Sequence, residues 1–177
     1  MPINLDPLLA HLPSWLLVLF RITGIFVIAP LLGARAIPAR VRIFWAVALS
    51  LCVYPMLLSV GSPAAKLITP VVKNGLSLWT TVPAVATELL IGLIIGYGAS
   101  LPLMGMQVSG RLVDQQLGMA LGGVFNPDVD DQAGVIGQFY YLLALALFVI
   151  LGGHRVMVGI LVDSFDTIPL GGFWPDL

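Results

Sequence analysis

Charged side chains are scarce in this sequence. Asp, Glu, Lys and Arg make up 10% of its 177 residues, whereas soluble domains carry about 25%. Hydrophobic residues reach 59%, which is more apolar surface than a soluble domain of this length can bury. The formal net charge is −1 and no basic tract is present, which excludes a nucleic-acid partner. The composition predicts an integral membrane protein whose apolar surface contacts lipid or partner subunits.

Cysteine and histidine are nearly absent as well. Cys52 is the only cysteine, so it has no partner for an internal disulfide. The two histidines, His11 and His154, are far apart in the chain and do not form a metal-ligand constellation. The sequence has no P-loop and no CxxC, HExxH or G-x-S-x-G motif. We therefore expect no enzymatic activity, no cofactor and no bound metal.

Long apolar runs are abundant. Four stretches are each near the roughly 20 residues that a helix needs to cross a bilayer. They cover residues 12–32, 43–60, 83–106 and 139–162, and the fourth is interrupted by Gly-Gly-His-Arg at 152–155. The predicted fold is an all-α, polytopic membrane protein with about four long, kinked apolar helices and broken hairpins.

The third stretch carries a polar face beyond its apolar part. Helical periodicity continues from Pro83 to about Leu121, a length of about 58 Å in a straight helix, so we expect Pro102 to kink or break it. After Pro102, polar side chains recur at spacings of three and four residues and share one face. These residues are Gln107, Arg111, Asp114 and Gln115. We expect this face to point inward, toward a cavity or a partner.

Two opposite charges lie inside apolar runs. Arg21 is about nine residues from either end of the first stretch, and an arginine at mid-membrane costs about 2.5–3.5 kcal/mol. Glu88, in the third stretch, is an available partner. The simplest interpretation is a structural ion pair, and a place on an ion or substrate path is the alternative.

Glycines at four-residue spacing occur in two places. Gly92 and Gly96 form one G-x-x-x-G pattern, and Gly118 and Gly122 form another. In an apolar helix this spacing allows two backbones to approach closely. We expect these glycines to mark helix-packing positions, with chance spacing as the competing interpretation.

Several blocks, read in order, resemble one known family. They are F-R-I-T-G at 20–24, A-P-L-L-G-A-R-A-I-P-A-R-V-R at 29–42, E-L-L-I-G-L-I-I-G at 88–96, D-Q-Q-L-G-M-A-L-G-G-V-F-N-P at 114–127, G-Q-F-Y-Y-L-L-A-L-A-L-F-V-I-L-G-G-H-R at 137–155 and D-S-F-D-T-I-P-L-G at 163–171. In this order and over nearly the whole chain they resemble the FliR/SctT family of type III protein export. The second and last blocks are more similar to the flagellar branch than to the virulence branch.

The resemblance implies a role that composition does not. It implies a non-enzymatic subunit of the flagellar type III export gate in the bacterial inner membrane, within the flagellar basal body. FliP-like and FliQ-like subunits would be its partners in a helical assembly, with other export-apparatus membrane proteins and lipid around it and unfolded proteins as the cargo. Residues 1–177 would form a single domain that lacks the C-terminal helices of the family.

The resemblance also implies a seal for the closed pore. In the family, the loop after the Q-x-G block helps to plug the pore. The matching positions here are Gly122, Gly123, Val124, Phe125 and Asn126, and Phe125 is the candidate stopper. A different function, a small-molecule or ion transporter or channel with Arg21, Glu88 and Asp114 on its path, is the alternative. Transporters often contain repeats or paired broken helices, and the sequence shows neither.

Overall fold

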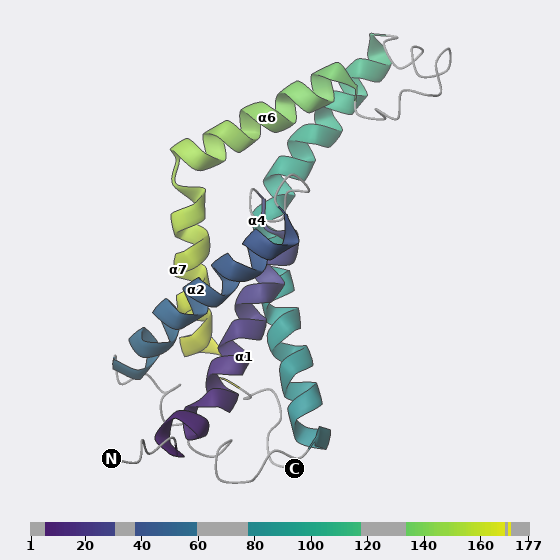
Figure 1. The fold of residues 1–177 in the computed structure, drawn as a ribbon. Helices are drawn as coiled ribbons and strands as arrows, with labels where there is room; N and C mark the ends of the chain where they lie inside the picture. The colour runs from purple at the N-terminus through teal and green to yellow at the C-terminus, as the bar shows by residue number, and fades with distance from the viewer. Residues whose placement is uncertain (1–5, 31–37, 60–77, 118–133, 169, 171–177) are drawn as a thin grey trace. The chain divides into compact units, whose positions relative to one another are not determined.

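The computed structural model describes residues 6–30, 38–59, 78–117, 134–168 and 170. Over these ranges the chain forms five helices and no strand (Figure 1). They are α1 (Asp6–Ile28), α2 (Ala39–Ser59), α4 (Leu78–Gln116), α6 (Val135–Ile150) and α7 (Gly153–Thr167). The predicted all-helical fold is confirmed.

Three of these helices are long and apolar enough to cross a membrane. The candidate spans are His11–Ile28, Ala39–Leu57 and Thr81–Gln116. The bent pair of α6 and α7 gives a fourth when the pair is taken as one span. The structure therefore agrees with the four apolar stretches expected from the sequence, including the interruption of the fourth.

The interruption between α6 and α7 is a glycine turn. Gly152 has φ +74°, a left-handed conformation that glycine adopts without the steric cost of a Cβ atom. The amides of Leu151 and Gly152 donate to the carbonyls of Leu147 and Val149 at 2.9 and 3.1 Å, which closes the last turn of α6. A new helix then begins at Gly153.

Prolines lie inside three of the helices that the structure describes. Pro102 lies inside α4, which continues to Gln116, so a break of the helix at Pro102 is wrong, and a kink there stays a prediction. Pro13 and Pro55 likewise lie inside α1 and α2. A proline removes one backbone hydrogen bond from a helix, and helices of the membrane type tolerate this loss through local adjustment and packing against neighbours.

The chain divides into two packed units, residues 1–97 with 157–177, and residues 98–156. In the first unit, α1 supplies more of the buried residues than any other helix, and it packs against α2. The buried residues of α1 recur every three or four positions: Ser14, Leu17, Val18, Arg21, Ile22, Ile25 and Phe26. In the second unit, the last part of α4 lies against the start of α6, with Leu103, Gly110, Asp114 and Gly137 buried.

Large apolar side chains remain exposed on all five described helices. Examples are Phe44 and Trp45 on α2, Ile94 on α4, and Phe139 and Ile150 on α6. Apolar surface of this extent on a soluble monomer would mark an interface. On helices of membrane-spanning length, it is a surface for lipid or for other subunits.

Candidate functional site

Arg21 is the most highly connected buried polar residue that the structure describes in the first unit. It is 0% exposed, and its Nε donates to Glu88 Oε2 on α4 at 2.5 Å. Its Nη1 donates to Ser164 Oγ and its Nη2 to the carbonyl of Ile168, each at 3.1 Å. The guanidinium also lies over the ring of Phe165, 4.2 Å from the centroid. One side chain therefore joins α1, α4 and the end of α7.

The surroundings of Arg21 compensate its charge from two directions. The Glu88 carboxylate is an opposite charge that is also almost fully buried. The Ile168 carbonyl lies just beyond the last residue of α7, where the ends of helices carry partial negative charge. Ser164 Oγ donates its own proton to the Leu161 carbonyl at 2.6 Å, so its oxygen serves as an acceptor for Arg21. A charge that would be costly in lipid is thus satisfied within the protein.

Glycines bring α1 and α4 close enough for this ion pair. A Cβ atom added to Gly92 would overlap the Arg21 carbonyl oxygen and lie 3.1 Å from Gly24 Cα. A Cβ atom on Gly24 would lie 2.5 Å from the Leu89 carbonyl oxygen, and one on Gly96 would lie 2.9 Å from the Ile25 carbonyl oxygen. The two glycines selected from the sequence on α4 therefore lie at the contact with α1, together with Gly24.

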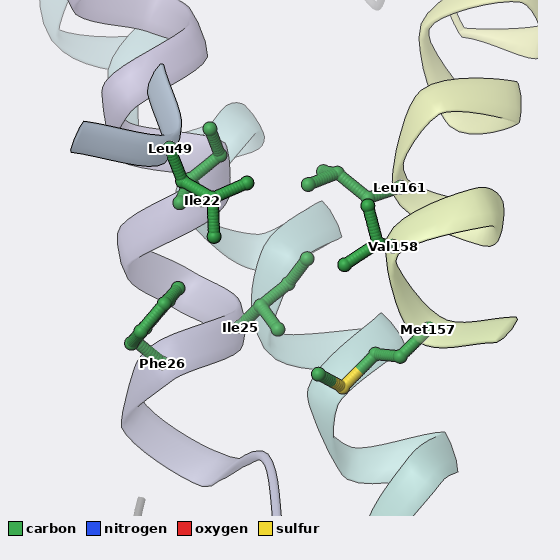
Figure 2. A pocket seen from close by; sticks show the side chains of 7 residues that line it. All are labelled: Ile22, Ile25, Phe26, Leu49, Met157, Val158 and Leu161. Carbon is green, nitrogen blue, oxygen red and sulfur yellow. The ribbon is translucent and has the colours of Figure 1, made fainter. Parts of the chain in front are cut away.

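A small apolar pocket lies among α1, α2 and α7 (Figure 2). Its volume is about 20 Å³, and a cavity of this size without polar partners does not hold an ordered water. The lining side chains are all apolar: Ile22, Ile25, Phe26, Leu49, Met157, Val158 and Leu161. The pocket is a packing gap in the core, and it offers no chemistry for a ligand.

The four residues of the predicted polar face have different environments in the second unit. Asp114 is buried, and its carboxylate accepts hydrogen bonds from the amides at the start of α6. Gln107 is half-buried, whereas Arg111 and Gln115 are exposed. The backbone carbonyl of Gln107 and the side-chain Cγ of Arg111 both lie beside Gly137 of α6. The structure thus brings three of the four residues to the α6 contact, and a cavity on this face stays a prediction.

The predicted plug residues lie outside the described part of the chain. These are residues 122–126, and their sealing role stays a prediction. Gly118, a predicted helix-packing glycine, also lies outside the described residues, and its packing role stays a prediction. Within the described ranges, no group of three or more His, Cys, Asp or Glu residues is placed to hold a metal ion.

Several residues of these contacts were not selected from the sequence. Ser164 and Phe165 lie in the D-S-F-D block, but nothing in that block connects them with Arg21. Gly110, Gly134 and Gly137 lack the four-residue spacing that drew attention to Gly92 and Gly96. Their role becomes visible only when α6 is placed against α4.

Taken together, the candidate membrane spans among the described helices and the apolar side chains that they leave exposed are those of a helical membrane protein. Comparison with known proteins identifies the family to which it belongs. Residues 12–177 match the family described as bacterial export proteins, family 1. The chain belongs to this family, which is one of membrane export proteins rather than enzymes.

Individual relatives come from flagellar and secretion systems. The chain is 27% identical over 163 residues to the flagellar biosynthetic protein FliR of Escherichia coli (strain K12), covering 90% of this chain and 58% of the relative. It is 29% identical over 164 residues to the FliR protein of Bacillus subtilis (strain 168), covering 93% and 59%. It is 26% identical over 163 residues to the Yop proteins translocation protein T of Yersinia pestis, covering 92% and 58%. The chain spans 58–59% of the length of these relatives, and the expected resemblance to the FliR/SctT family is confirmed.

Proposed function

We propose that the chain acts as a structural subunit of the flagellar type III export gate in the bacterial inner membrane. The family match over residues 12–177 carries this proposal. Relatives named flagellar biosynthetic protein FliR support the flagellar basal body as its location. A relative named for Yop translocation also matches, so the property common to these relatives is protein export rather than the flagellum itself.

In this proposal, FliP-like and FliQ-like subunits cover part of the apolar surface of the described helices. The exposed side chains of Phe44, Trp45 and Ile94 support such contacts, and lipid covers the remainder. The buried ion pair of Arg21 and Glu88 supports a structural role, because it fixes helices relative to each other and leaves neither charge at the surface.

Affinity purification tests the assembly. The tagged chain is purified in mild detergent from membranes that also contain FliP-like and FliQ-like subunits. We expect stable co-elution of both partners, and a Phe44→Lys variant should reduce their recovery by placing a charge on the exposed face of α2. Elution of the chain alone, from membranes in which the two partners are assembled with each other, would contradict the proposal.

We place the seal of the closed pore at residues 122–126, with Phe125 as the stopper. The composition supports this: glycines, which permit backbone shapes closed to other residues, precede one bulky apolar ring. The acidic stretch at 128–131 follows directly. A ring between glycines and hydrophilic residues can close a narrow opening to ions and still move aside for a polypeptide.

Ion conductance of the assembled gate tests the seal. Phe125→Ala should raise the resting conductance several-fold while the complex stays intact, because the ring that closes the opening is removed. Val124→Ala, which trims a smaller apolar side chain in the same segment, is the matched control and should have a smaller effect. Wild-type conductance in an assembled Phe125→Ala gate would show that this segment is not the seal.

The transporter alternative receives no support from the described residues. Arg21 and Glu88 are bonded to each other, and Arg21 has two further protein acceptors. Both carboxylate oxygens of Asp114 are occupied by backbone amides. Charges on a transport path need at least one state in which they face the solute, and these three residues are engaged within the protein.

A further inference from the structure

Helix α6 begins without a capping side chain of its own. Its N-cap residue is Gly134, with φ −52° and ψ 151°, and the first amides of a helix have no acceptor within that helix. In most helices a Ser, Thr, Asp or Asn at the N-cap accepts from the second or third helical amide. In α6 those amides belong to Ile136 and Gly137.

Asp114 of α4 supplies the missing acceptors. Its Oδ1 accepts from the Ile136 amide at 3.2 Å and its Oδ2 from the Gly137 amide at 2.9 Å. The Asp114 side chain is 2% exposed, so water does not compete for these bonds. A carboxylate at a helix N-terminus also faces the positive end of the helix dipole. The carboxylate therefore does, from another helix, what an N-cap side chain ordinarily does.

Three glycines make room for this contact. A Cβ atom on Gly134 would overlap the Asp114 carboxylate itself. A Cβ atom on Gly110 would lie 2.5 Å from Gly137 Cα, and one on Gly137 would lie 3.2 Å from Arg111 Cγ. The backbones of α4 and α6 thus touch at the point where the carboxylate reaches the amides. A local cap at position 134 and the cap from Asp114 exclude each other.

We propose that Asp114 is a positioning residue that caps α6 from α4 and thereby holds Leu117 and Gly134 in a fixed relation. These two residues are the described ends of the connection that carries residues 122–126. Insofar as it concerns the pore, this inference rests on the function proposed above: a seal on that connection needs fixed ends. The capping contact itself depends only on the described residues of α4 and α6.

Two variants distinguish two functions of Asp114: capping the N-terminus of α6, and fixing the position of α6 relative to α4. Asp114→Ala removes both functions. Asp114→Ala combined with Gly134→Ser restores a cap, because serine is a good N-cap residue. The serine Cβ atom would lie 2.8 Å from the Cβ atom that remains at position 114, so the start of α6 must shift slightly away from α4 to admit it. Asp163→Ala, which removes an exposed carboxylate from α7, is the matched control.

Two measurements on the full chain in detergent report the outcome. Hydrogen exchange at the Ile136 and Gly137 amides reports the cap. Electron paramagnetic resonance measures the distances between spin labels at Leu117→Cys and Phe139→Cys, in a Cys52→Ser background. The width of their distribution reports how firmly α6 is positioned against α4. Leu117 and Phe139 are both exposed, so the labels do not disturb the contact.

We expect Asp114→Ala to accelerate exchange at the two amides by on the order of tenfold and to broaden the label distances. The double variant should recover slow exchange but keep the broad distances. Wild-type exchange and distances in Asp114→Ala would overturn the inference, and so would a double variant with narrow distances. If Asp114→Ala is not recovered, Asp114→Asn serves instead: its NH₂ replaces one acceptor oxygen, so exchange should accelerate at one of the two amides.

Conductance of the assembled gate then separates this inference from the proposed function. Raised conductance in Asp114→Ala supports both the positioning role of Asp114 and the seal at residues 122–126. Broad label distances with unchanged conductance would leave the positioning role of Asp114 in place and count against the seal at residues 122–126.

Discussion

The two packed units of this chain each bury a charge between helices, and they satisfy it differently. In the unit of residues 1–97 and 157–177, Arg21 meets a second charge, Glu88, and two further acceptors at the end of α7. In the unit of residues 98–156, Asp114 meets only the backbone amides of α6. Both charges lie where glycines let two helices touch, and each faces the helix end of complementary polarity.

The difference determines what the sequence can reveal. An ion pair leaves a pattern, because two opposite charges stand out in apolar runs. A carboxylate bound by amides leaves none, since every residue except proline has a backbone N–H. Accordingly, Arg21 and Glu88 could be proposed as partners from the sequence, while Asp114 could be noticed only as one polar residue of a stripe.

The largest effect should come from breaking the ion pair on one side. Arg21→Met or Glu88→Leu alone should destabilise the chain by about 3–5 kcal/mol, because each leaves an uncompensated buried charge. The double variant should recover part of this loss but not all, since the bonds from Arg21 to Ser164 and Ile168 are also gone. Unfolding by a denaturing detergent measures all four members of the cycle. A double variant as unstable as the sum of the singles would refute a coupled pair.

Unfolding by the same detergent also measures the cap in the second unit. Asp114→Ala leaves neutral amides rather than a charge, so it should cost about 0.5–2 kcal/mol, as for the loss of a helix cap. An equal loss in the two units would mean that the ion pair and the backbone cap are energetically alike.

An intermediate effect should come from filling the glycine contacts. Gly92→Ala and Gly110→Ala should each cost about 1–3 kcal/mol, because the added methyl group meets the backbone of a neighbouring helix. Gly98 and Gly105 are the matched controls on the same helix, since a Cβ atom there meets nothing within 4 Å. Alanine at these two positions should stabilise α4 by at most about 1 kcal/mol. Equal losses at contact and control positions would show that close approach is not what these glycines provide.

The smallest effect should come from Ser164→Ala. It removes one of three acceptors of Arg21 and leaves the ion pair intact, so we expect a loss of about 1–1.5 kcal/mol. Ser109→Ala is the control, because Ser109 is exposed and its hydroxyl bonds within α4, to the Gly105 carbonyl. A loss for Ser164→Ala as large as that for Arg21→Met would mean that α7, rather than Glu88, is the main partner of the arginine.

The sequence predicted the helices better than their contacts. Apolar runs and helical periodicity located α1, α2 and α4 with ends up to six residues from those observed, and the glycines at 152–153 marked the turn between α6 and α7. Of the two outcomes expected at Pro102, the break is wrong, because proline removes one hydrogen bond whereas α4 retains the bonds on either side; the kink stays a prediction. The return of α7 to Arg21 and the cap on α6 could not be predicted, since both depend on which distant segments become neighbours.

The network around Arg21 also has a consequence for biosynthesis. Glu88 follows Arg21 by 67 residues, Ser164 by 143 and Ile168 by 147. At a synthesis rate of roughly 5–20 residues per second, the last of these partners leaves the ribosome roughly 7–30 s after the arginine. For the first part of that interval the cation has none of these acceptors, and until α7 has been made it has only Glu88. Water, lipid headgroups or the insertion machinery must hold that charge meanwhile, and α1 reaches its final place only after α7 has been made.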